Sequence, residues 1–112
     1  MSAPLRLLFV HGPASACWRA GFDVAQAAAA LDVPVELGFA GDGLGLIRAG
    51  LDDAHGKRAC GAYASLELLG IEVVYAPAAG PVDTAAAPVL PVSWLQPADW
   101  QAWLRRAPLQ VW

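Results

Sequence analysis

Two side chains that could take part in covalent chemistry stand close together near the start of this 112-residue chain. His11 and Cys17 flank one turn, and a thiol near a helix N-terminus is favoured as the reactive thiolate. The histidine could act as its base, although no third group that would orient the imidazole is evident. Cys17 could equally be a small buried hydrophobe under Trp18. We carry both interpretations and favour the structural one.

A second candidate is the turn that contains Asp42. This carboxylate lies between Gly41 and Gly43, after an apolar run, which is a position typical of catalytic or metal-binding carboxylates. The same residue types are typical of a turn in which Asp accepts backbone hydrogen bonds beside glycine, and we favour that reading. Gly12 in the first turn, Asp42 and Gly43 are therefore candidate ligand or interface turns.

Metal and nucleotide sites are not indicated. His11, Cys17, His55 and Cys60 lack the close pairs, such as Cys-x-x-Cys, that zinc sites use, and Cys60 is expected to be structural. The first turn lacks the glycine patterns of nucleotide-binding loops, and Pro13 has no amide to offer a phosphate. We therefore expect neither a metal nor a cofactor.

Strands that alternate with helices position these residues. Leu5–Val10 is apolar on both faces, as a central parallel strand should be, and Ser15 can cap the Ala-rich helix that follows. The expected strands are Leu5–Val10, Val33–Ala40, Ile71–Tyr75, Val89–Val92 and Leu109–Trp112. The expected helices are Ser15–Leu31, Lys57–Leu69 and one that starts at Pro97. This alternation predicts a single domain over residues 1–112, a three-layer α/β sandwich, flavodoxin-like in outline, with a mostly parallel sheet of about five strands.

Two connections are expected to be irregular. Asp52–Gly56 reads as a loop before the second helix, which Gly70 ends. Ala76–Pro88 has no periodicity and is rich in Pro, Gly and Ala, so we expect a flexible loop there.

The composition indicates an oligomer. Hydrophobic residues make up 57% of the chain and charged residues 15%, so few charges remain to cover a small domain. Tryptophans concentrate near the C-terminus. We expect Trp100 and Trp103 in the core, whereas Trp94 and Trp112 are the interface candidates, because Trp is enriched at contact surfaces.

Charge and hydropathy exclude two further partner classes. The net charge is −3, and the basic pairs Lys57-Arg58 and Arg105-Arg106 are expected to face water, so no direct nucleic-acid binding is expected. No apolar run is long enough to span a membrane, and the run after Arg6 is too short for a secretory signal. We expect a cytoplasmic protein with reduced thiols.

The order of elements resembles the DsrE/DsrF-like superfamily, and within it the TusC/DsrF type of sulfur-relay subunit. The resemblance covers nearly the whole chain and is carried by three short segments and an aromatic last residue after the closing helix. The segments are Arg19-Ala-Gly-Phe-Asp23, Phe39-Ala-Gly-Asp42-Gly43-Leu44 and Leu68-Leu69-Gly70-Ile71.

This resemblance implies a small flavodoxin-like subunit that forms homo-oligomers or assembles with related DsrE-like and DsrH-like subunits. Such assemblies relay persulfide sulfur, towards tRNA thiolation in some members and in sulfur oxidation in others. The relay cysteine of the DsrE-type subunit follows the third strand, where this chain reads Tyr75-Ala-Pro-Ala-Ala79. The resemblance therefore implies a non-catalytic partner subunit.

Two alternatives remain open. The chain could be a stand-alone persulfide carrier or redox protein that uses Cys17 with His11 as its helper. It could also be a small-molecule-binding α/β domain that uses the turns at Gly12 and Asp42.

Overall fold

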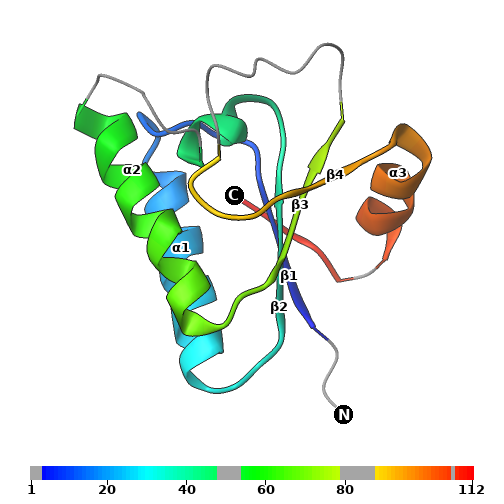
Figure 1. Cartoon of the computed structure of the whole chain (residues 1–112), viewed down its shortest axis with the longest axis horizontal. Helices are drawn as coiled ribbons and strands as arrows, with labels where there is room; N and C mark the ends of the chain where they lie inside the picture. Colours follow the sequence, from blue (N-terminus) through cyan, green and yellow to red (C-terminus); the bar gives the residue numbers. More distant parts are fainter. Residues whose placement is uncertain (1–3, 48–53, 79–87, 107) are drawn as a thin grey trace.

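The computed structural model describes residues 4–47, 54–78, 88–106 and 108–112, and Figure 1 shows their arrangement. The strands are β1 (Leu5–Phe9), β2 (Val35–Phe39), β3 (Val73–Pro77), β4 (Ser93–Leu95) and β5 (Gln110–Val111). The α-helices are α1 (Cys17–Ala30), α2 (Ala54–Ala64) and α3 (Pro97–Arg105), and two 3-10 helices are η1 (Gly41–Leu46) and η2 (Ser65–Leu69).

All five strands join one parallel sheet in the order β4-β3-β2-β1-β5. β1 lies between β2 and β5. Its residue Leu7 is opposite Leu37 of β2 on one side and opposite Gln110 of β5 on the other. The predicted α/β class and parallel sheet are thus confirmed. In flavodoxin the first strand lies between the second and the third, so the likeness to that fold is one of layers and outline.

Three layers result because successive strand residues point to opposite faces of the sheet. In Figure 1, α1 and α2 lie together on one side of the sheet and α3 lies alone on the other. Leu7, Phe9 and Leu37 are fully buried on the α1–α2 side. Leu8 packs on the α3 side with Trp100 and Trp103. Both tryptophans are buried, which confirms the expectation that they belong to the core.

Tyr63 of α2 lies at the centre of the larger core. Its hydroxyl donates a hydrogen bond of 3.0 Å to the carbonyl of Trp18, which ties α2 to α1. Burial raises the pKa of Tyr63, and the negative charge of Asp23 acts in the same direction. The rings that meet Tyr63 edge-on are Phe9, Phe22 and Phe39.

A charged residue is buried on the opposite face. Arg6 of β1 is only 3% exposed, and its Nε lies 3.9 Å from Oε1 of Glu36, its register partner on β2. Its guanidinium lies 4.6 Å from the ring centre of Trp103, whose indole N–H donates to Glu36 Oε1 at 2.8 Å. Desolvation lowers the pKa of Arg6, and the charge of Glu36 opposes that shift.

Helix boundaries agree with the sequence at Gly70 and Pro97 and differ at the starts of α1 and α2. α1 begins at Cys17 and not at Ser15, since Ala16 is its N-cap residue and no side chain caps it. The Ser15 hydroxyl accepts the Cys17 N–H at 3.2 Å from one position before the N-cap. Gly70, with φ +85°, ends η2, and Pro97 opens α3. The prediction of a loop over Asp52–Gly56 is wrong from Ala54 onward, because α2 already begins there.

The fourth strand is also misplaced by the sequence. The apolar run Val89–Val92 lies outside the sheet, and β4 is formed by the next residues, Ser93–Leu95. The reason is that the Val89 N–H donates to the carbonyl of Ile47 at 2.7 Å, and Pro91 has no N–H to donate. Of the expected loop Ala76–Pro88, residues 79–87 lie outside the described residues, while Ala76 and Pro77 belong to β3.

Candidate functional site

The two turns singled out from the sequence meet at the carboxyl ends of β1 and β2. A β-carbon on Gly12 would lie 3.3 Å from the carbonyl oxygen of Asp42. Gly43 lies directly against the carbonyl of Phe9, so no side chain fits at this position. Gly41 adopts φ +56°, which favours glycine. Gly12, Asp42 and Gly43 are thus neighbours, and backbone packing accounts for the glycine at 43.

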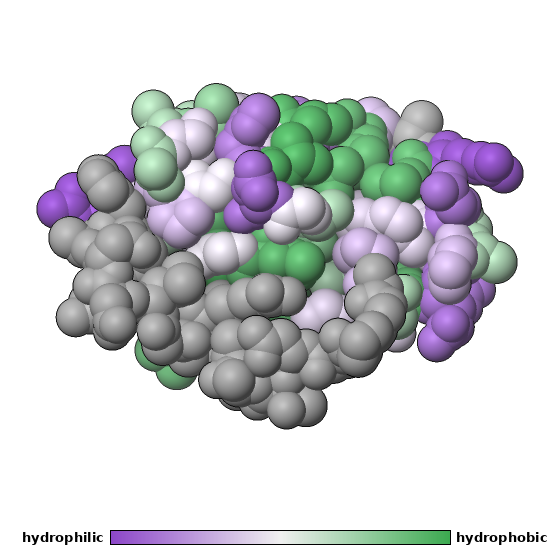
Figure 2. All heavy atoms as spheres, turned by 90° about the horizontal axis from the view of Figure 1, so that it is seen from above, coloured by the Kyte–Doolittle hydropathy of each residue, from purple (hydrophilic) through white to green (hydrophobic). Residues whose placement is uncertain are grey.

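Figure 2 looks onto this end of the molecule and shows hydrophobic residues in green beside polar and charged ones in purple. The carboxylate of Asp42 is exposed here. Throughout the described ranges, His, Cys, Asp and Glu side chains form no group of three that could hold a metal ion.

His11 and Cys17 are both exposed, and the structure does not join them as a base and a nucleophile. Within the described part of the chain, neither the imidazole nor the thiol has a hydrogen-bond partner. The His11 backbone N–H donates to the carbonyl of Trp112 at 3.4 Å, and the Cys17 N–H donates to Ser15. The favoured interpretation of Cys17 as a small buried hydrophobe is therefore wrong, since its thiol is accessible, and no helper is bound to it.

The second cysteine has structural contacts. Cys60 of α2 is half-buried, and its Sγ lies 3.8 Å from the carbonyl oxygen of Gly45 in η1. It thus connects α2 to the 3-10 helix that follows β2, in agreement with its expected structural role. The side chain of His55 lies outside the described residues.

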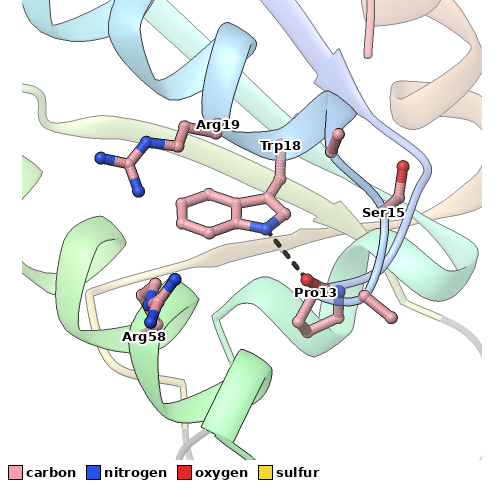
Figure 3. Close-up of a pocket in the computed structure, with 7 residues that line it drawn as sticks. Pro13, Ser15, Trp18, Arg19 and Arg58 are labelled. Atoms are coloured by element: carbon pink, nitrogen blue, oxygen red, sulfur yellow. Dashed lines mark hydrogen bonds between the residues drawn. The ribbon is translucent and has the colours of Figure 1, made fainter.

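The structure shows a cavity that the sequence does not indicate. It has a volume of about 290 Å³ and lies between the start of α1 and the flank of α2. Figure 3 shows the guanidinium groups of Arg19 and Arg58 extending from the two helices on either side of the Trp18 indole. The lining residues are Pro13, Ala14, Ser15, Ala16, Trp18, Arg19 and Arg58.

The walls of this cavity are fixed by hydrogen bonds. The indole N–H of Trp18 donates to the carbonyl of Pro13 at 3.0 Å, so the turn is fastened to the helix that follows it. The backbone carbonyl of the same tryptophan accepts the hydroxyl of Tyr63. Trp18 is only 7% exposed and therefore forms a preformed wall between the two arginines.

Sequence patterns could not reveal this pair. Arg19 appears within an Ala-rich helix, and Arg58 appears as half of a basic pair that was expected to face water. Arg58 is indeed exposed, but it shares its cavity with Arg19 because α1 and α2 pack on the same face of the sheet. The proximity of the two arginines is therefore visible only in the tertiary structure.

The two interface candidates differ in exposure. Trp94 is 38% exposed on the edge strand β4. Trp112 is half-buried and packs on α1, where a β-carbon at Gly21 would lie 2.8 Å from its ring. Among the side chains that the structure describes, the other large apolar ones that are exposed are Leu31, Leu68, Leu69 and Val111.

No protein-family model matches the chain, and no curated protein matches its sequence. Of the helices in the described ranges, none is both long and apolar enough to cross a membrane. The described side chains thus offer three features for a functional site. They are an exposed thiol on α1, a carboxylate at a strand end and a cationic cavity between two helices.

Proposed function

We propose that this protein is a non-catalytic, oligomer-forming subunit of a sulfur-relay assembly of the DsrE/DsrF type. One observation carries the proposal. The carboxyl end of β3, where the resembling family places its relay cysteine, reads Ala76-Pro77-Ala78. Both thiols of the chain stand on other elements, Cys17 on α1 and Cys60 on α2. The three-layer parallel fold is the one that the resemblance implies.

The outer strands support assembly with other subunits. β4 and β5 are the two edges of the sheet, and an edge strand presents unpaired N–H and C=O groups to a neighbour. Each edge also exposes a large apolar side chain, Trp94 on β4 and Val111 on β5, the latter 59% exposed. Apolar side chains at such places are typical of contact surfaces.

The test is the molar mass in solution, measured by light scattering during size exclusion. We expect a mass above that of one chain, either for the protein alone or after co-expression with DsrE-like and DsrH-like subunits. Trp94→Asp and Val111→Asp should reduce that mass, whereas Arg105→Gln, an exposed change on α3, should not. A stable monomer that binds neither kind of subunit contradicts the proposal.

A second candidate function rests on the exposure of Cys17. In that case the thiol carries a persulfide by itself. Incubation with a persulfide donor followed by intact-protein mass spectrometry separates the two functions. A carrier thiol takes the outer sulfur atom of the donor persulfide and releases the donor as a thiol. Cys17→Ser abolishes this gain of one sulfur atom, whereas Cys60→Ser retains it. A non-catalytic subunit passes no sulfur to an acceptor protein, with or without Cys17.

A further inference from the structure

We propose that the cavity between α1 and α2 binds a small phosphate-type oxyanion through the guanidinium groups of Arg19 and Arg58. This inference goes beyond the subunit function and does not depend on it, because the cavity lies on the helical layer and not on the strand edges. It concerns a site that the turns at Gly12 and Asp42 do not include.

The first argument is charge. Arg19 and Arg58 line the same cavity from two different helices, and the seven lining residues include no carboxylate. Neither arginine forms an ion pair with a residue in the described ranges. Two like charges that share one cavity repel each other, and an anion between them removes that repulsion. Guanidinium groups bind phosphate oxygens in a paired, planar geometry, so arginine suits this ligand better than lysine would.

The second argument is that the start of α1 borders the same space. The first turn of α1 forms one wall and adds the partial positive charge of a helix start. This partial charge has the same sign as the arginine charges.

The third argument is rigidity and size. Trp18 is held by its bond to Pro13 and is almost fully buried, so the wall between the arginines exists before any ligand arrives. Preorganised sites lose less conformational freedom on binding. The volume of about 290 Å³ lies at the lower limit of pockets for drug-sized ligands. The cavity therefore suits inorganic phosphate or a phosphate ester with a small organic group.

The test is an NMR titration of the whole protein with sodium phosphate, with phenyl phosphate and with sodium acetate, at an ionic strength held constant with sodium chloride. The indole N–H signal of Trp18 reports on the cavity directly, since its ring is the wall between the arginines. We expect saturable shifts of this signal with both phosphates and weaker binding of acetate, which has one charge and two oxygens.

Matched variants identify the binding groups. Arg19→Gln and Arg58→Gln should each weaken phosphate binding about tenfold, because a hydrogen bond to a charged group is worth roughly that factor at a partly exposed site. Arg105→Gln removes an exposed arginine from α3, on the other face of the sheet, and should leave the affinity unchanged. If a glutamine variant does not fold, methionine at the same position replaces it and keeps the side-chain stem.

Three results overturn the proposal. They are the absence of saturable shifts at Trp18 with either phosphate, an affinity that both cavity variants leave unchanged, and acetate binding as tight as phosphate binding. None of them bears on the oligomer proposal, which light scattering tests separately.

Discussion

The indole ring of Trp103 occupies the space that a side chain on Gly38 would need. A β-carbon at this position of β2 would lie 2.5 Å from the ring. Trp103 is 1% exposed, and its hydrogen bond to Glu36, two residues before Gly38 on the same strand, holds the indole against β2. Gly38 and Trp103 together set how closely α3 approaches the sheet.

Gly38→Ala should therefore destabilise the protein by about 1–3 kcal/mol, the usual cost of overpacking a core. The measurement is the free energy of unfolding from urea denaturation. Gly61→Ala is the matched control, since a β-carbon there meets nothing within 4 Å in the interior of α2. That variant should gain roughly 0.5–1 kcal/mol from its helix propensity. Equal effects of the two changes would contradict the packing argument.

Gly43→Ala should cost more than Gly12→Ala. The β-carbon at Gly43 would collide with the backbone carbonyl of Phe9, which can move only if β1 moves, whereas at Gly12 it would lie 3.3 Å from the Asp42 carbonyl in an adjustable turn. We expect a loss of about 3 kcal/mol for Gly43→Ala and less than half of that for Gly12→Ala. Thermal denaturation followed by circular dichroism ranks the two, and the opposite order would show that the turn at 12 is the tighter one.

Tyr63→Phe should lower the free energy of unfolding by about 1 kcal/mol at pH 7, because it removes the hydrogen bond to the Trp18 carbonyl and leaves that acceptor with one partner fewer. The rings around Tyr63 keep their contacts. Urea denaturation at pH 7 measures the difference, and a variant as stable as the parent would mean that the hydroxyl contributes nothing.

At high pH the order should reverse, and Tyr63→Phe should become more stable than the parent protein. The pKa of Tyr63 is raised in the folded state, so the unfolded state loses its proton first, above about pH 10. The stabilisation from the neutral, buried hydroxyl is full below that pH. It is lost by about 1.4 kcal/mol per pH unit above it. Tyr63→Phe has no hydroxyl to ionise, so the free energies of unfolding of the parent protein and the variant should become equal at about pH 11. Parallel pH profiles would contradict burial of the hydroxyl.

The Arg6–Glu36 pair predicts a result that depends on which partner is changed. Glu36→Gln keeps an acceptor for the Trp103 N–H but leaves the buried guanidinium without its charge partner. We expect a loss of about 3 kcal/mol, the cost of breaking a buried pair. Adding Arg6→Met removes the uncompensated charge and should recover most of that loss. Denaturant unfolding of both variants tests this, and additive losses in the double variant would refute the coupling.

Local patterns predicted most of the fold. The apolar run of β1, the left-handed glycine at 70 and the proline that opens α3 are each determined by nearby residues. The spacing of Trp100 and Trp103 placed both on the buried face of one helix. These features depend on backbone chemistry and helical periodicity, which a single sequence contains.

Tertiary contacts decided the rest. The run Val89–Val92 has the composition of a strand, yet the hydrogen bond from Val89 to Ile47 keeps it out of the sheet. Arg6 stands in an apolar run, and only the register of β1 against β2 gives it Glu36 as a partner. The turns at 12 and 42 were each named from the sequence, but their contact and the cationic cavity both depend on how distant elements pack.

The position of β5 has a consequence for how the chain folds. β1 is completed on one side by residues more than 100 positions away, as the bond from Arg6 to the Pro108 carbonyl illustrates with a separation of 102. Closing so long a loop is entropically costly, and chains with many such contacts fold slowly. Until that closure, Arg6 and Leu8 lack the cover that α3 provides. The third layer of the molecule therefore depends on contacts that only the last helix and strand of the chain can supply.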